Sequence, residues 1–292
     1  MNATLPTLPW RLDGRSCLLT GATAGIGRES AHLLAAMGAA LVLVGRSKRK
    51  LDQTVASVRR ASPGVTVQPM VADLSSQSDV RHLAERVLRE VPHLHVLINN
   101  AAVVTQRREE TVDGIERQFA VNHLAPFLLT NLLLDRLAES APARVVIVAS
   151  QVERGGEIDL ADLQARAKPY EGNRAYSQSK LANILFAGEL ARRVADRGIT
   201  TISLHPGVYT TRLLHDLLGW SRVVTKLRGR SLPGPEAGGL VIAHAAAAPE
   251  LQGGGTIHLH EHVVQEPSEH ARDEAMAAAL WTASARLTGI EA

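Results

Sequence analysis

Thr20-Gly21-Ala22-Thr23-Ala24-Gly25-Ile26-Gly27 separates a short apolar run from a helical pattern. Residues 16–20 are typical of a buried strand, and residues 26–37 of the helix that follows it. Glycines in this turn let the backbone fold tightly and approach a phosphate closely, while the helix N-terminus offers unpaired N–H groups. The alternative is a purely structural glycine-rich turn. Its place after the first strand of an alternating chain favours a dinucleotide site.

Short apolar runs alternate with helical patterns along the rest of the chain. This alternation predicts one doubly wound α/β Rossmann domain over residues 1–292, with a seven-stranded parallel sheet flanked by helices on both faces. Predicted strands are 16–20, 40–44, 65–71, 96–99, 144–149, 200–204 and 256–259, and predicted helices are 26–37, 48–61, 77–91, 112–138, 174–197 and 235–247. Gly38 and Gly198 lie near the expected ends of two of these helices.

Composition excludes several function classes. Hydrophobic residues make up 45% of the 292 residues and charged residues 21%, so we expect a sizeable core rather than disorder. The net charge of +3 is small and dispersed, which argues against nucleic-acid binding. One cysteine, Cys17, leaves no internal disulfide. Without a secretory pattern or an apolar run of membrane-spanning length, we expect a cytoplasmic protein with no membrane anchor.

The end of the second predicted strand indicates which cofactor is used. NAD sites usually carry an acidic residue there, to bond the adenosine ribose. This chain instead has Arg46 and Ser47, followed by Lys48 and Arg49. Arg46 could hold a 2′-phosphate through a charge-assisted fork, although it could also simply begin a solvated basic helix. NADP(H) is therefore favoured over NAD(H).

Tyr176 and Lys180 are spaced four apart on a predicted helix. Side chains at this spacing share one helix face, with Cβ atoms about 5–6 Å apart. A nearby ammonium favours the ionised form of a tyrosine, which could then move protons near neutral pH. The spacing by itself is common on ordinary amphipathic helices.

Taken together, the motifs resemble the short-chain dehydrogenase/reductase family from Gly14 to about Leu259. The residues that carry the resemblance are Thr20–Gly27, Asp73-Leu74, Asn99-Asn-Ala-Ala102, Asn122, Ser150, Tyr176, Lys180 and Pro206-Gly207. Within the family, the chain is most similar to the retinol-dehydrogenase-like reductases. That similarity rests on residues 158–163 and 176–184 and on the gap of 26 positions from Ser150 to Tyr176.

The resemblance implies a role for each matched residue. Tyr176 would be the general acid/base, Ser150 would hydrogen-bond the substrate oxygen, and Lys180 would lower the tyrosine pKa and bond the nicotinamide ribose. Asn122 would hold a water in a proton relay. Asp73 would bond the adenine edge, and the turn after the sixth strand would face the nicotinamide. The implied cofactor-binding set is Gly21, Thr23, Ala24, Gly25, Ile26, Gly27, Arg46, Ser47, Asp73, Leu74, Asn99, Ala101, Tyr176, Lys180, Pro206, Gly207, Val208 and Thr210.

Departures from the family pattern are small. Ala102 stands where glycine is commoner, and Ala149 stands where many relatives have a serine. The membrane anchor of many retinol dehydrogenases has no counterpart here, which puts a membrane retinoid role in doubt. A homo-oligomer is compatible with the resemblance, because the helix carrying Tyr176 often packs against a partner in this family.

We expect the cofactor half at about 14–150 and the catalytic and substrate half at about 150–262, followed by a C-terminal tail at 263–292. Leucines and valines recur at helical spacing from Thr211 to Leu227 and predict a lid, near 209–235, over an apolar substrate pocket. The same stripe is compatible with core packing, or with a membrane or partner surface.

The resulting hypothesis is an NADP(H)-dependent oxidoreductase acting on a hydrophobic carbonyl or a secondary or primary alcohol, with Tyr176 as the general acid/base. The alternative is a non-catalytic NADP(H) sensor or scaffold, against which the intact set of site residues counts. The histidines at 258, 260 and 262 do not match a recognised metal-ligand spacing, and no metal is predicted.

Overall fold

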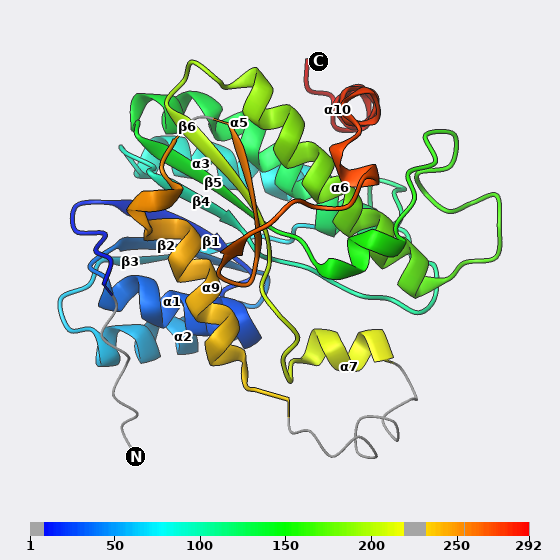
Figure 1. The fold of residues 1–292 in the computed structure, drawn as a ribbon. Coiled ribbons are helices and arrows are strands. Elements are labelled where there is room, and N and C mark those ends of the chain that lie inside the picture. Colours follow the sequence, from blue (N-terminus) through cyan, green and yellow to red (C-terminus); the bar gives the residue numbers. More distant parts are fainter. Residues whose placement is uncertain (1–8, 219–231, 254, 292) are drawn as a thin grey trace.

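The strands of the computed structural model, which describes residues 9–218, 232–253 and 255–291, form one sheet (Figure 1). Its eight strands follow the order β3-β2-β1-β4-β5-β6-β7-β8. All neighbours pair in parallel except β7 and β8, which pair antiparallel. The strands are β1 (Ser16–Thr20), β2 (Ala40–Gly45), β3 (Val67–Val71), β4 (Val96–Asn99), β5 (Ala143–Val148), β6 (Ile199–His205), β7 (Thr256–His260) and β8 (Val263–Val264). The predicted doubly wound parallel sheet is confirmed, and β8 adds a short edge strand.

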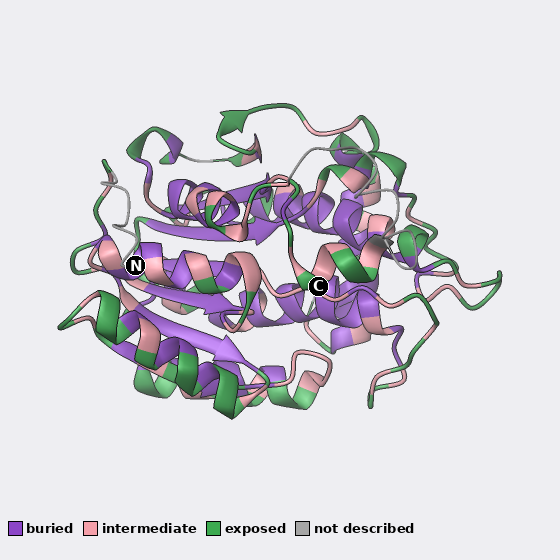
Figure 2. Ribbon diagram, turned by 90° about the horizontal axis from the view of Figure 1, so that it is seen from below, coloured by how far each residue is buried: buried purple, intermediate pink, exposed green. Residues whose placement is uncertain are grey.

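Helices cover both faces of the sheet (Figures 1 and 2). The apolar residues of α1 (Gly25–Ala36), α2 (Lys48–Ala61) and α9 (Pro235–Ala247) pack on one face. Those of α3 (Gln77–Glu90), α5 (Ala125–Glu139) and α6 (Gly172–Arg193) pack on the other. Every residue of β4, β5 and β6 is buried, as expected for central parallel strands covered on both sides.

The helix predicted from Val112 to Ala138 is different in the structure. It begins with α4 (Arg117–Phe119), because the carboxylate of Glu116 caps it by accepting the backbone N–H groups of Gln118 and Phe119 at 2.9 and 2.7 Å. A π-helical turn, η1 (Ala120–Leu124), then precedes α5. Pro126 in the first turn of α5 has no N–H group to offer the carbonyl four residues earlier, which belongs to Asn122.

Residues 263–292, which we expected as a tail, contain α10 (Glu274–Thr288). Its Trp281 is 5% exposed and packs edge-on against Phe127 of α5, with ring centroids 4.9 Å apart. Trp281 also lies 5.8 Å from the ring of Phe186 on α6. The C-terminal helix therefore completes the core on the α6 side.

Only the first part of the expected lid can be placed. It forms α7 (Arg212–Leu218), which stands apart from the two main helix layers (Figure 1). The rest of the predicted apolar stripe, residues 219–227, lies outside the described residues. The remaining short turns are η2 (Gln151–Gly155), η3 (Pro249–Leu251) and η4 (His270–Arg272). The helix α6 ends at Arg193, and Gly198, with φ of +66°, lies in the turn beyond it.

Candidate active site

The glycine-rich turn between β1 and α1 depends on close packing. Gly21 and Gly25 have φ of +70° and +52°, in the left-handed region that favours glycine. Gly27 needs glycine for a different reason, since a Cβ there would lie 2.3 Å from the carbonyl oxygen of Gly21. A Cβ on Gly21 would likewise lie 2.9 Å from the Cα of Ala101. The turn therefore has no room for a side chain at Gly21 or at Gly27.

Asn100 joins this turn to the loop after β4. Its amide donates to the carbonyl oxygen of Thr20 at 2.8 Å, and the Thr20 hydroxyl accepts the backbone N–H groups of Asn100 and Ala101 at 3.0 and 3.1 Å. Neither Thr20 nor Asn100 is in the predicted site set. Both lie within the motifs quoted from the sequence, but only the contact between the two loops shows their role.

The residues of the turn fit a dinucleotide phosphate. The helix α1 has no side-chain cap and no acidic residue in its first turn, so its N-terminal N–H groups and positive dipole end face the turn free of a competing carboxylate. Thr23 packs against Gly45 at the end of β2, and Ile26 packs against the core. The methyl carbon of Thr211, from the loop after β6, approaches the Cβ position of Gly25 to 3.4 Å. The two loops therefore face each other across the same edge.

The predicted adenosine end gathers around Asp73. Its carboxylate accepts the backbone N–H and the hydroxyl of Ser75 at 3.0 and 2.8 Å. Burial pushes the pKa of Asp73 up, but these hydrogen bonds and the charges of Arg46 and Arg117 outweigh it, so the pKa lies below its ordinary value. Arg46 is exposed at the end of β2 and close enough for its charge to act on Asp73.

The neighbours of these two residues have structural roles. Ser47 caps α2 by accepting the backbone N–H of Lys50 at 3.5 Å. Leu74 is half-buried and packs against the α3 side of the core.

Tyr176 and Lys180 lie buried on α6, with 4% and 2% of their surfaces exposed. The Lys180 ammonium nitrogen lies 5.4 Å from the centroid of the tyrosine ring. It donates a hydrogen bond to the carbonyl oxygen of Val148, the last residue of β5, at 2.8 Å. The predicted pair is therefore brought together at the carboxyl end of the central strand.

Burial dominates the electrostatics of the pair. It lowers the pKa of Lys180 to about 7 and raises the pKa of Tyr176 above its ordinary value. In the protein by itself, burial outweighs any lowering of the tyrosine pKa by Lys180. Moving the phenolate out of water raises the tyrosine pKa by more than the nearby Lys180 amine, which is partly neutral, can lower it.

Ser150 directly follows β5 and lies two residues beyond the carbonyl that binds Lys180. Its hydroxyl accepts the backbone N–H of Val152 at 3.5 Å, at the start of η2. The turn η2 packs closely on the catalytic helix, because a Cβ on Gly156 would lie 2.7 Å from the carbonyl oxygen of Ser177. Ser150 is therefore held at the same edge as Tyr176.

Asn122, in η1, is fully buried, and its side chain is committed to the fold. Its amide pairs with both backbone groups of Val103, at 2.8 and 3.0 Å, and donates to the hydroxyl of Ser179 at 3.0 Å. The Ser179 hydroxyl in turn donates to the carbonyl oxygen of Tyr176 at 2.7 Å. The side chain thus ties the loop after β4 to α6, and it is not free to hold the predicted water.

Asn99 does not place its side chain at the cofactor edge. It is 3% exposed, and its amide donates to the Thr130 hydroxyl of α5 at 3.0 Å. As the last residue of a strand, it alternates in direction with its neighbours, and its side chain lies on the α5 side. Ala101, by contrast, lies beside Gly21 of the glycine turn.

The turn after β6 carries the last predicted cofactor residues. Pro206 is buried and Val208 is 41% exposed. Gly207 has φ of +102°, and a Cβ there would meet the Tyr209 hydroxyl at 2.4 Å. The Thr210 hydroxyl and backbone N–H both donate to the carbonyl oxygen of Pro233, at 3.3 and 3.2 Å. That contact closes the base of the segment that contains α7.

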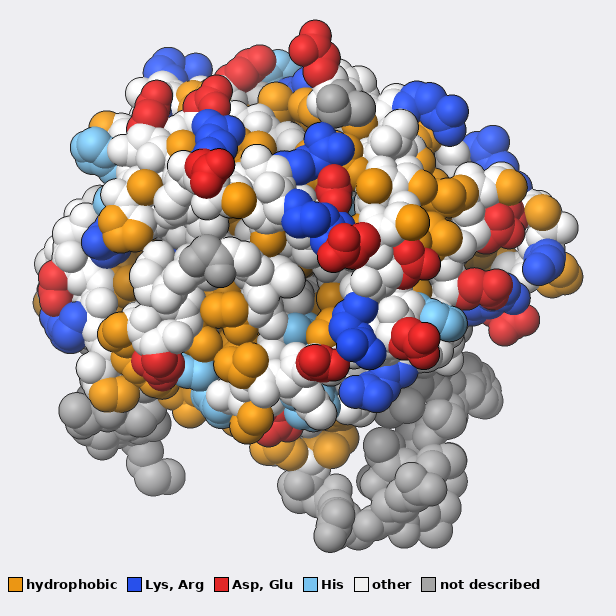
Figure 3. Space-filling view, turned by 45° about the horizontal axis from the view of Figure 1, so that its top comes forward, with side chains coloured by type: hydrophobic (Ala, Val, Ile, Leu, Met, Phe, Trp, Pro, Cys, Tyr) orange, Lys and Arg blue, Asp and Glu red, His pale blue; other side chains and the backbone are white. Residues whose placement is uncertain are grey.

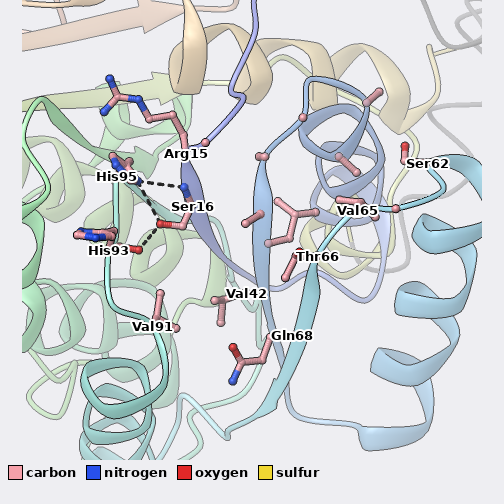
Figure 4. A pocket seen from close by; sticks show the side chains of 18 of the residues that line it. Arg15, Ser16, Val42, Ser62, Val65, Thr66, Gln68, Val91, His93 and His95 are labelled. Atoms are coloured by element: carbon pink, nitrogen blue, oxygen red, sulfur yellow. Dashed lines mark hydrogen bonds between the residues drawn. The ribbon is translucent and has the colours of Figure 1, made fainter.

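A groove of about 850 Å³ lies at the opposite edge of the sheet, at the amino ends of β1 to β4 (Figure 4). Arg15, Val65 and Thr66 line it, and the Ser16 backbone N–H donates to His95 Nδ1 at 3.0 Å. Ligands of open parallel sheets bind at the carboxyl ends of the strands, so the groove lies at the edge opposite to Tyr176.

On the face shown in Figure 3, acidic and basic side chains are interspersed.

Comparison with known proteins identifies relatives of the whole chain. The family model for short chain dehydrogenase matches residues 15–221. Retinol dehydrogenase 13 of Homo sapiens is 36% identical over 286 residues, covering 96% of this chain and 86% of the relative. Polyprenol dehydrogenase of Mus musculus is 40% identical over 292 residues, covering 97% and 86%.

Two solved structures have the same fold. An uncharacterized protein from Mycobacterium paratuberculosis is 35% identical, with a TM-score of 0.78 and 96% of each chain covered. A short chain dehydrogenase from Burkholderia cenocepacia in complex with NADP is 25% identical, with a TM-score of 0.69, and covers 86% of this chain and 97% of its own.

Gly27→Ala tests the packing of the glycine turn. The added methyl group would meet the Gly21 carbonyl oxygen, so we expect a loss of about 1–3 kcal/mol in the free energy of unfolding. Gly188→Ala on α6 is the matched control, since nothing lies within 4 Å of its Cβ position. Alanine there should stabilise the helix by up to about 1 kcal/mol. Urea unfolding of both variants measures these changes in the free energy of unfolding. A Gly27→Ala variant as stable as the parent would contradict the assigned packing.

The stability of the cofactor-free protein should depend on pH through Lys180. Burial lowers the pKa of Lys180 from 10.5 to about 7, so between these values the unfolded chain binds more protons than the folded one. The free energy of unfolding therefore rises with pH across this window. Lys180→Met should remove that rise, measured as the difference between the two proteins from pH 6 to pH 10. If the free energies of unfolding of the parent and of Lys180→Met change with pH in parallel, the Lys180 ammonium is not buried as described.

Proposed function

Because this chain belongs to the short chain dehydrogenase family, we propose that it transfers a hydride between NADP(H) and an apolar alcohol or carbonyl compound. The observation that carries the proposal is the burial of Tyr176 and Lys180 at the end of β5, beside Ser150. The glycine turn with the uncapped N-terminus of α1 lies at the same edge. A proton-handling pair and a phosphate cradle at one edge are the parts that this chemistry needs.

When bound, the nicotinamide supplies the hydride, and the protein supplies position and a proton. Tyr176 is protonated at neutral pH, because burial raises its pKa, and it can donate its proton to a substrate oxygen as negative charge develops there. The Ser150 hydroxyl can hydrogen-bond to the same oxygen. Lys180, with its pKa near 7, can pass a proton to the phenolate that remains.

Arg46 supports the preference for NADP(H). It is exposed at the end of β2, where its guanidinium can form a bidentate hydrogen bond with a 2′-phosphate. Asp73, just beyond the end of the neighbouring strand β3, lies within range of its charge. The similar Burkholderia structure was solved in complex with NADP, which also supports NADP(H) over NAD(H).

An apolar substrate follows from the relatives and from α7. Retinol and polyprenol, which appear in the names of the relatives, are long apolar alcohols. Leu213, Leu214 and Leu217 of α7 are half-buried, and α7 is held by the amide of Gln106, which donates to the carbonyl oxygen of Asp216 at 2.8 Å.

Among the described helices, none is both long and apolar enough to cross a bilayer.

Tyr176→Phe tests the proton role. We expect kcat to fall by about 10²–10⁴-fold, because the phenyl ring keeps the packing and removes the proton donor. NADPH oxidation with apolar aldehydes and ketones measures it, with NADP⁺ and alcohols for the reverse direction. Tyr170→Phe is the control, since the Tyr170 hydroxyl donates to Glu116, the cap of α4, at 2.9 Å and is not among the proposed site residues.

Full turnover by Tyr176→Phe would refute the assigned role. If the parent binds NADPH tightly but turns over none of these substrates, the protein is instead a non-catalytic sensor or scaffold.

Arg46→Ala tests the cofactor choice. Losing a charge-assisted contact should weaken NADPH binding by about tenfold or more, and NADH binding much less. Arg60→Ala removes the same charge from the far end of α2 and should leave both affinities within about twofold. Fluorescence titration of each protein with both cofactors gives the ratio. Equal losses for NADPH and NADH in Arg46→Ala would show that it does not read the 2′-phosphate.

A further inference from the structure

A buried carboxylate lies three residues beyond Ser150. Glu153, in the short turn η2, is 2% exposed, although none of the proposed chemistry uses it. A carboxylate that is taken out of water must be hydrogen-bonded. Ser268, which follows β8, bonds both of its oxygens. Glu153 Oε1 accepts the backbone N–H of Ser268 at 3.2 Å, and Oε2 accepts the Ser268 hydroxyl at 2.6 Å.

Ser268 belongs to a segment that is fixed on α6. Its hydroxyl and its carbonyl oxygen both accept the backbone N–H of Ala271, at 3.3 and 3.1 Å. The turn η4, which contains Ala271, packs against α6 and is followed by α10 (Figure 1). Ala271 is 8% exposed and lies in the same core cluster as Ala149, the residue before Ser150. The carboxylate of Glu153 is therefore tied to a packed part of the fold.

The direction of the Ser150 side chain depends on η2. Ser150 is extended, with φ of −167°, and η2 begins at the next residue. Within the described residues, the Ser150 hydroxyl makes one hydrogen bond, a long one of 3.5 Å from the backbone N–H of Val152. A short 3₁₀ turn has poor hydrogen-bond geometry by itself. Support for the turn from outside therefore helps to fix the Ser150 hydroxyl.

Glu153 is the residue through which η2 receives that support. Its backbone N–H donates to the carbonyl oxygen of Ser150 at 3.0 Å, and its own carbonyl oxygen accepts the N–H of Gly156 at 2.8 Å. Gly156 in turn lies against α6, where a Cβ would be 2.7 Å from the carbonyl oxygen of Ser177. One residue thus joins the Ser150 backbone, the helix that carries Tyr176 and the segment before α10.

We propose that Glu153 is a positioning residue of the active site, which through Ser268 holds η2, and with it the Ser150 hydroxyl, at the substrate oxygen beside Tyr176. The proposal rests on the proposed function, in which Ser150 hydrogen-bonds that oxygen. Glu153 itself touches neither cofactor nor substrate, because its oxygens are bonded by Ser268. Placement matters at this point, since a misplacement of about 1 Å can lower a rate about 10²-fold.

Glu153→Ala tests the positioning in the NADPH-oxidation assay with apolar aldehydes and ketones. The shortened side chain releases η2 from Ser268, so we expect kcat to fall about tenfold. KM and NADPH affinity should stay within about twofold, because the glycine turn that faces the cofactor is unchanged. A Glu153→Ala variant with the parent kcat would overturn the proposal.

Glu189→Ala is the matched control for a general loss of stability. Glu189 is a 7% exposed carboxylate near the far end of α6, where it accepts hydrogen bonds from Arg192 and Arg193 at 2.8 Å each. Its loss should lower the free energy of unfolding, measured with urea, and leave kcat as in the parent. An equal fall of kcat in this variant would mean that lost stability explains the effect, which contradicts the proposal.

A double-mutant cycle with Ser150 separates positioning from other effects. Ser150→Ala removes the hydroxyl that Glu153 is proposed to place, so Glu153→Ala should lower kcat no further in that background. If Glu153→Ala lowers kcat about tenfold with and without the Ser150 hydroxyl, it acts by another route and the proposal is wrong.

Ser268→Ala decides if Glu153→Ala does not fold, judged by circular dichroism. It removes the shorter of the two hydrogen bonds and keeps the backbone N–H, so kcat should fall about threefold, and only while Ser150 is present. An unchanged kcat there overturns the proposal. These failures leave the proposed function standing, because the parent still turns over and Tyr176→Phe does not. A parent protein without turnover would end both proposals.

Discussion

The hydrogen bonds between Asn100 and Thr20 join the first and fourth strands at their carboxyl ends, and the rest of the site depends on this junction. It brings the loop after β4 so close to the glycine turn that Gly21 and Gly27 have no room for a Cβ. The same loop is tied to the catalytic helix through Asn122 and Ser179. The glycine turn and the Tyr176–Lys180 pair are thus linked by a chain of hydrogen bonds that runs through the loop after β4.

Burial sets the protonation of Tyr176 and Lys180. An exposed tyrosine and lysine would both keep pKa values near 10, far from neutral pH. Inside α6 burial lowers the lysine pKa to about 7 and raises that of the tyrosine, so an ammonium here gives up its proton readily to a phenolate and the tyrosine stays protonated. The Val148 carbonyl stabilises the ammonium while the pair is out of water.

Much of the fold and of the site could be predicted from local patterns. The strands and most helices follow the period of apolar residues, and the helical spacing of Tyr176 and Lys180 is kept. The errors have physical causes. The helix expected from Val112 starts at Arg117 because Glu116 caps it, and η1 interrupts it ahead of Pro126. Asn99 was assigned to the cofactor edge, but strand alternation turns its side chain toward Thr130.

The sequence by itself determined the order of strands and helices, the glycine turn and the residue types of the site, because these depend on spacing and on intrinsic backbone freedom. Only the tertiary structure decided which partners those residues find. The contact of Asn100 with Thr20, the packing of Trp281 on α5 and the hydrogen bonds of Glu153 with Ser268 join positions far apart in the chain. Hydrogen bonds and burial depend on distance in space, and spacing along the chain does not give that distance.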